Sequence, residues 1–471
     1  MAGQLSVTTG DLLDLASASA LIAQREIRAS ELVEFMLDRI DRINPKVNAY
    51  IAILADEARE QAATVDQELT QGRWRGPLHG VTFAVKDLIH VAGAPTTGGS
   101  RTMDGYIATR DAACVARLRA AGAIVLGKLH THELAGGATS ESELYGRARN
   151  PWNLDYIPGG SSGGSAVATA AGLVHGALGT DTGGSVRMPA AFCGVVGFKG
   201  TFGRVSRSGV LARSWTMDHV GSLARTVRDA ALLFQAMAGH DATDPYSSNR
   251  HVPDCMKGLE TGIRGLRVGI VTGEFFESQL DPQIGDAFDK ATRTLESLGA
   301  VTKPVRFELA AAAHAAGTII TLAEAAASQD EVMRSAPERF GPDIRAQLRL
   351  AEFISARQYL RALRVRAVVQ AEIETMLRDI DVLITPTTSA MPTRSDGTTS
   401  AESLVLFARN MRPFSMPGLP AISVPAGFST EGLPIGLQII GRPFDEATIL
   451  RAARAYEGAT AWHTRLPPVW N

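Results

Sequence analysis

Cysteine is scarce in this chain of 471 residues, which contains only Cys114, Cys193 and Cys255. An odd, widely spaced set provides neither the paired framework of a disulfide-rich secreted protein nor the clustered ligands of a zinc site. We therefore expect buried thiols in a reducing compartment, the cytoplasm. We also expect no metal and no other cofactor.

An excess of charge of either sign is also missing. Lys and Arg number 47 against 49 Asp and Glu, which leaves a formal charge of −2. No basic run is long enough to follow a phosphate backbone, so we expect no direct contact with nucleic acid.

Long apolar runs are few as well. The most apolar one, residues 309–327, is rich in alanine and interrupted by His314, Gly317 and Glu324. This pattern favours a packed helix over a membrane span. The N-terminus lacks a basic start followed by an apolar run, so no secretory signal is expected.

The patterns that are present predict alternating helices and strands, as in an α/β protein. Apolar residues at helical spacing predict a first helix that begins at Ser30 and ends before Pro45, and a second over residues 56–68. This helical segment, residues 1–70, is expected to serve packing or a subunit contact. Further along, we expect strands over residues 81–85, 123–127, 176–181, 266–271 and 380–385, and paired helices over 342–374.

Glycine is concentrated around two serine-bearing turns, residues 159–164 and 182–185, on either side of a segment of small residues. Such turns allow positive φ and let backbone N–H groups approach a ligand closely. In the second turn, Thr182, Gly183 and Gly184 could direct N–H donors toward an oxyanion beside the hydroxyl of Ser185. This arrangement suits acyl transfer. Asp181 and Arg187 flank the turn and could hold it as an ion pair.

A serine nucleophile needs a base to take its proton. The G-x-S-x-G pattern of the α/β-hydrolases is absent around Ser185, and His219 has no matching acid, so a histidine-based triad is disfavoured. Lys86, at the end of the expected strand 81–85, is the other candidate. Its amine either extends to water or is buried and loses its proton, which a general base requires.

Together, Lys86, Ser161 and Ser185, in the segments GPLHGVTFAVKD, GGSSGGS and GTDTGGSVRMPAAFCGVVGFKGT, resemble the amidase signature family. The spacings of 75 and 24 residues agree with those of the family. The similarity continues in GLPAISVPAGF and LPIGLQIIGRPFDEATILRAARAYE. It covers nearly the whole chain and is weakest between residues 244 and 380.

The resemblance implies one domain over residues 1–471, an α/β fold with a large mixed, mostly parallel central sheet covered by helices on both faces. It also implies a Ser–cis-Ser–Lys triad in which Ser185 attacks the amide and Ser161 relays the proton to neutral Lys86. The cis bond would join Gly160 to Ser161. The oxyanion donors would be the backbone N–H groups of Thr182, Gly183, Gly184 and Ser185.

The resemblance implies a substrate pocket lined by Gly136 and Gly137, and a more variable wall from residues 245–415. We also place Ser162 among the substrate contacts; its hydroxyl could instead support the relay by hydrogen bonding or stabilise the turn. Phe407, Met411, Phe414 and Met416 either make that wall apolar or belong to the core. His132 and Glu133 lack the spacing of a metal site.

The expected activity is hydrolysis of a small carboxamide through an acyl-enzyme on Ser185, by a stand-alone enzyme and possible homodimer that binds no membrane. The alternative is the glutamine-hydrolysing A subunit of a tRNA-dependent amidotransferase. That branch carries an acidic residue shortly before the segment matching GLPAISVP, and residues 403–417 contain no Asp or Glu. A third hypothesis is a catalytically inactive scaffold that keeps the fold for binding.

Overall fold

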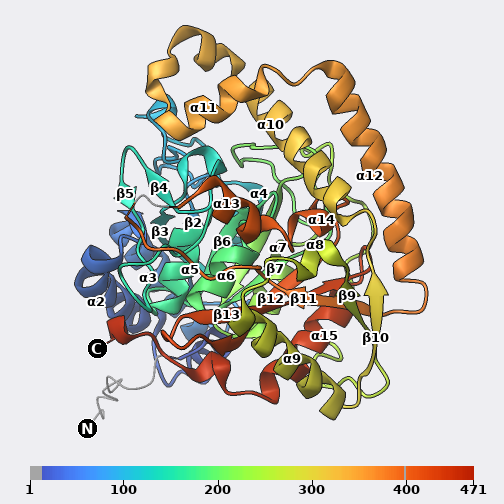
Figure 1. Ribbon diagram of the computed structural model, residues 1–471. Helices are drawn as coiled ribbons and strands as arrows, with labels where there is room; N and C mark the ends of the chain where they lie inside the picture. The colour runs from blue at the N-terminus through green and yellow to red at the C-terminus, as the bar shows by residue number, and fades with distance from the viewer. Residues whose placement is uncertain (1–12, 397–398, 471) are drawn as a thin grey trace.

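The computed structural model describes residues 13–396 and 399–470 and is built around one sheet of eleven strands (Figure 1). In spatial order these strands are β1 (Tyr50–Ile53), β3 (Ile124–Leu129), β2 (Thr82–Lys86), β6 (Gly176–Asp181), β8 (His219–Ala224), β7 (Val196–Lys199), β12 (Ala421–Phe428), β13 (Pro434–Gly441), β11 (Val382–Pro386), β9 (Arg267–Thr272) and β10 (Val301–Arg306). A separate hairpin pairs β4 (Glu141–Ser142) with β5 (Gly146–Arg147). The five strands expected from the sequence are therefore present, with bounds that differ by a few residues.

The predicted mixed sheet is confirmed, although "mostly parallel" overstates the share of parallel strand pairs. Parallel pairs occur in two runs, β3–β2–β6 and β11–β9–β10. Antiparallel pairs join β6 through β8, β7, β12 and β13 to β11, and β1 pairs antiparallel at one edge. The β12–β13 pair is joined by a short turn, and a connection that short permits only antiparallel neighbours.

Helices cover both faces of the sheet, as expected. The helices of the chain are α1 (Leu15–Ala23), α2 (Ala29–Val47), α3 (Ala55–Thr70), α4 (Ala113–Ala120), α5 (Gly163–Ala170), α6 (Arg187–Cys193), α7 (Val227–Met237), α8 (Glu274–Glu277), α9 (Pro282–Ser297), α10 (Ala310–Ser335), α11 (Pro342–Ala351), α12 (Ala356–Met376), α13 (Ala401–Ala408), α14 (Arg412–Ser415) and α15 (Glu446–Gly458). On β6, a Cβ at Gly179 would meet Ser162 at the start of α5, whereas one at Gly176 would meet Leu233 of α7. Because side chains alternate along a strand, α5 and α7 lie on opposite faces.

The first long helix departs from its predicted bounds. It begins at Ala29, after a capping box between Arg28 and Glu31, and it continues through Pro45 to Val47. Pro45 lies in the last turn, where it removes one hydrogen bond of the helix. Val47 is fully buried, and this burial favours continuing the helix past the proline.

Helix α10 packs against both α11 and α12, and the three lie along the top and right of the molecule in Figure 1. By length and composition, α10 is the one described helix that could cross a membrane. It instead packs on α11, α12 and α14 and buries Glu324, whose carboxylate accepts hydrogen bonds from Ser214, Thr216 and Tyr359. The predicted packed helix is therefore present.

An ion pair at the end of β6 fixes the second glycine turn. Asp181 and Arg187 are fully buried, and their closest N–O distance is 2.9 Å. The Arg187 guanidinium also donates to Gln438 Oε1 on β13 and to Ser415 Oγ in α14, both at 2.5 Å. This network ties the turn to the C-terminal part of the sheet, and it gives Arg187 the structural role expected from the sequence.

Replacing Arg187 should destabilise the protein strongly. Arg187→Met leaves Asp181 as an unpaired buried charge, a change that costs about 3–5 kcal/mol in unfolding free energy. Arg334→Met is the matched control, because Arg334 forms an exposed pair with Asp330 that is worth at most about 1 kcal/mol. Urea unfolding measures both variants, and equal losses would contradict a special role for Arg187.

Candidate active site

Lys86 ends β2 inside the protein, and its amine lies among hydroxyl groups. The Nζ atom is 2.7 Å from Ser161 Oγ, 2.8 Å from Thr180 Oγ1 and 3.0 Å from Ser162 Oγ. The Lys86 side chain is fully buried, so it does not extend to water. Thr180 was not anticipated from the sequence, because its place depends on the pairing of β2 with β6.

Burial lowers the pKa of Lys86 to about 7, and the carboxylates of Asp218 and Asp181 oppose this only in part. The adjacent Asp87 does not act on the amine, because its carboxylate lies 2.9 Å from Lys128 and accepts from Thr97. A neutral amine has one lone pair and two N–H donors. Three neighbouring hydroxyls can satisfy both functions.

Ser161 and Ser185 differ in their exposure. Ser161 is fully buried, whereas Ser185 is partly exposed and lines a cavity. The peptide bond between Gly160 and Ser161 is cis, as the family resemblance implied. Among the described residues, Ser161 Oγ bonds to Lys86, but no hydrogen bond joins it to Ser185 Oγ. The structure thus brings one link of the expected relay within bonding distance.

The second glycine turn leaves N–H groups free at three of its four predicted positions. Within residues 13–396 and 399–470, the N–H groups of Thr182, Gly183 and Ser185 find no acceptor. The N–H of Gly184 donates to Asp181 Oδ1 at 2.8 Å. The prediction of Gly184 as an oxyanion donor is therefore wrong, because the ion-paired carboxylate holds that group.

The cavity beside Ser185 has a volume of about 310 Å³. Gly136 and Gly137 line it, as predicted, together with Gly160, Thr182 and Gly183. The 245–415 region supplies a second wall, formed by Thr318, Thr321, Leu322, Gln347, Leu404, Val405, Ala408 and Arg412. The remaining lining residues are Ala135, Ala138, Met188 and Arg213.

One expectation about this cavity needs correction, and one alternative that the sequence left open is decided. Ser162 does not line it, because its hydroxyl is buried against Lys86 and donates to the Thr180 carbonyl. The contact with Lys86 agrees with the alternative that this hydroxyl supports the relay. The aromatic and methionine residues 407, 411, 414 and 416 are core residues and not the cavity wall. Arg213 and Arg412, which do line it, were missed. In the sequence, the only indication of either arginine is that a charged residue interrupts an otherwise apolar stretch.

His132 and Glu133 are engaged in structural contacts. His132 Nε2 lies 3.0 Å from Asp343 Oδ2, and Glu133 accepts from Ser100 and from the Gly341 N–H. Within the described residues, no group of three or more His, Cys, Asp or Glu could hold a metal ion.

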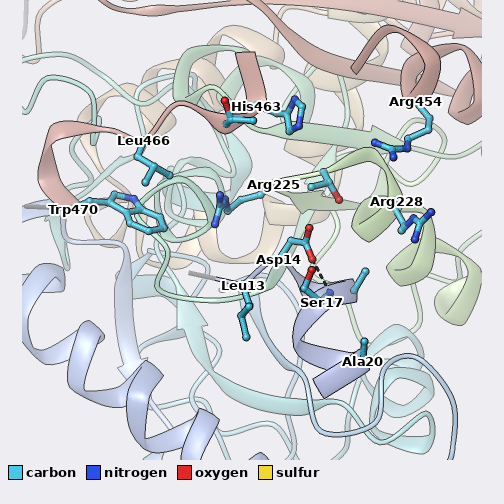
Figure 2. A pocket seen from close by; sticks show the side chains of 13 residues that line it. Leu13, Asp14, Ser17, Ala20, Arg225, Arg228, Arg454, His463, Leu466 and Trp470 are labelled. Atoms are coloured by element: carbon cyan, nitrogen blue, oxygen red, sulfur yellow. Dashed lines mark hydrogen bonds between the residues drawn. The ribbon is translucent and has the colours of Figure 1, made fainter. Parts of the chain in front are cut away.

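A larger cavity of about 680 Å³ lies away from these residues (Figure 2). Residues near the start of α1, before and within α7, and near the C-terminus line it, among them Asp14, Arg225, His463 and Trp470. Neither Lys86 nor the serines of the two glycine turns belong to its lining. Size alone therefore does not identify the chemical site.

Comparison with known proteins places the chain among enzymes of one family. The model of the Amidase family matches residues 31–450. The A subunit of the glutamyl-tRNA(Gln) amidotransferase of Moorella thermoacetica is 39% identical over 95% of this chain and 97% of its own length. A structure described as an unexpected vestigial protein complex, which reveals the evolutionary origins of an s-triazine catabolic enzyme, superposes with a TM-score of 0.91. It is 34% identical and covers 95% of this chain and 98% of that one. A bacterial aryl acylamidase of the amidase signature family gives a TM-score of 0.89 at 28% identity, with 96% and 98% coverage.

These findings correct the prediction about partners. We expected a small amide as the sole partner of a stand-alone enzyme or homodimer. The relatives include one component of an amidotransferase and a chain from a protein complex, which contradicts that expectation. The family resemblance offered an amidotransferase subunit as the alternative, but no local pattern favoured it, because a subunit interface resembles ordinary surface in a single chain. The match over residues 31–450 shows that the chain belongs to the amidase family, the amidase signature enzymes that act on amide-type C–N bonds.

Proposed function

We propose that the chain hydrolyses a carboxamide through an acyl-enzyme on Ser185. Ser185 Oγ attacks the carbonyl carbon while its proton passes to Ser161 Oγ, and the proton of Ser161 passes to neutral Lys86. The reverse transfers protonate the departing nitrogen, the C–N bond breaks, and an ester remains on Ser185. Water activated by the same relay then attacks the ester, releases the carboxylate and restores the serine.

One observation carries this proposal. A buried amine, without a carboxylate partner in the described part of the chain, lies 2.7 Å from Ser161 Oγ, and the N–H of Ser162 donates to the carbonyl of the partly exposed Ser185 at 3.2 Å. The N–H groups of Thr182, Gly183 and Ser185 are our candidate donors to the oxyanion. Three free buried cysteines fit a reducing compartment, and we propose the cytoplasm.

We further propose that the chain works as one component of an assembly. The relatives favour the glutamine-hydrolysing component of an amidotransferase over a stand-alone hydrolase, because 39% identity extends over 95% of the chain. Residues 1–70 are our proposed subunit contact, and residues 1–12 lie outside the described part. Against glutamine as substrate stands the lining of the cavity, where the described residues offer no carboxylate for an α-ammonium group.

Labelling should identify the nucleophile. A fluorophosphonate probe is expected to modify Ser185, with the adduct located by peptide mass spectrometry. Ser185→Ala should lose the label and lower kcat/KM for amides by about a thousandfold or more. Ser165→Ala is the matched control, because that hydroxyl only donates to the Leu178 carbonyl. A label on another residue would contradict the assignment.

The pH dependence should report Lys86. Below its pKa the ammonium has no lone pair for the Ser161 proton, so kcat/KM should fall as the pH drops through about 7 and level off above it. Lys86→Met and Lys86→Arg should each lose about a hundredfold or more, since neither side chain accepts a proton at neutral pH. Activity retained in Lys86→Arg, or a flat profile between about pH 5.5 and 9, would refute this role.

Affinity purification of the tagged full-length chain from its source organism should test the proposed assembly. If the chain is a component of an amidotransferase, other chains should co-purify in fixed ratio, and glutamine hydrolysis should increase at least about tenfold in their presence. A single species with full glutaminase activity would contradict it. The measurements are native mass spectrometry and ammonia release.

A further inference from the structure

Two arginines line the cavity that contains Ser185, and neither has a carboxylate partner within the described residues. Arg213 Nη2 donates to Gln347 Oε1 at 2.9 Å, and Arg412 Nη1 donates to Thr318 Oγ1 at 2.6 Å. Arg412 Nε is buried and has no hydrogen-bond partner there. Neutral acceptors therefore satisfy only some of the N–H donors of each guanidinium.

Both cations are held where charge is unfavourable. Burial lowers the pKa of Arg213 to about 10, and burial together with repulsion from Arg213 lowers the pKa of Arg412 to about 10. Both side chains remain protonated at neutral pH. Buried charges in proteins are normally paired, so two adjacent cations without a counter-ion suggest that one arrives with a ligand.

The carboxylates that act on Arg213 from a distance are already engaged. Asp218 accepts from Thr182 Oγ1 at 2.5 Å and from the backbone N–H groups of Arg213 and Ser214. Asp343 bonds to His132. Among the residues that the structure describes, no Asp or Glu lines the cavity. A bound molecule would therefore meet positive charge without a balancing negative group.

Both guanidiniums reach the backbone close to the proposed chemistry. A Cβ built on Gly183 would lie 2.9 Å from Arg412 Nε, and one built on Gly136 would lie 3.0 Å from Arg213 Nη1. Gly183 belongs to the turn that carries Ser185. Leu322, Leu404 and Val405 supply apolar wall in the same cavity, which suits methylene groups between an amide and an anionic end.

We infer that Arg213 and Arg412 bind the carboxylate of an anionic amide substrate that carries no balancing ammonium group. The inference rests on the acyl-enzyme chemistry of the proposed function and specifies the substrate class of the same site; it argues against glutamine, the substrate of the amidotransferase role. Guanidinium groups pair with carboxylates in strong, charge-assisted hydrogen bonds. An ammonium group on the substrate would lie unpaired beside two cations.

The test uses the purified full-length chain, with any subunits that co-purify, on the monoamides of malonic, succinic, glutaric and adipic acid. The neutral comparison is the alkyl amide of the same length. For the best chain length, kcat/KM should exceed that of the neutral amide at least about tenfold. Glutaramate should also exceed glutamine, which has the same chain and an added ammonium group.

Arg213→Met and Arg412→Met should each lower kcat/KM for the acid about tenfold to a hundredfold and reduce the preference for acid over neutral amide. Arg409→Met is the matched control: Arg409 lies three residues from Arg412 but donates to Ser278 and does not line the cavity. It should keep the preference. Circular dichroism and the wild-type melting temperature establish that each variant is folded.

Equal turnover of acids and neutral amides by the wild type would overturn the inference, as would faster turnover of glutamine than of glutaramate. An undiminished preference in both arginine variants would also overturn it. In each case, fluorophosphonate labelling of wild-type Ser185 would show that the proposed function still stands. Absence of that label would instead refute the proposed function.

Discussion

The site depends on a lysine amine that is buried with no carboxylate among the described residues to hold its proton. Nearby carboxylates exist, and the fold engages each of them elsewhere. Asp87 pairs with Lys128, Asp181 with Arg187, and Asp218 accepts from Thr182 and the backbone. If one of them turned toward Lys86, its charge would favour the ammonium form and raise the pKa of the lysine. The ion pairs around the site therefore act on its chemistry as well as on its stability.

The sequence predicted well what local patterns encode. The strand that carries Lys86, the strand before the second turn and the two glycine turns all lie where apolar runs and glycine clusters indicated them. The contact between Lys86 and Ser161 followed from the family resemblance and not from any local pattern. Its geometry requires β2 to lie beside β6, which only the assembled sheet determines.

The failed predictions concern where a side chain points and which residues, distant in sequence, meet in the fold. No local pattern shows that the Asp181 carboxylate turns back to take the N–H of Gly184, or that Ser162 faces Lys86 and not the cavity. Arg213 and Arg412 are distant in sequence and meet only because α14 and the segment before β8 border the same cavity. The continuation of the first long helix past Pro45 is likewise a tertiary effect, because burial overrides the local rule that a helix ends before a proline.

The network around Arg187 has a consequence for when the protein becomes functional. Lys86, Ser161 and Ser185 all lie in the N-terminal half of the chain, but Arg187 completes its bonds with Ser415 and Gln438, which are synthesised near the end. A nascent chain that has exposed all three candidate catalytic residues still lacks the strand that secures the turn carrying Ser185. The bonds that fix this turn thus form only after β13 has been synthesised, and fragments that end before β13 carry the candidate groups without those bonds.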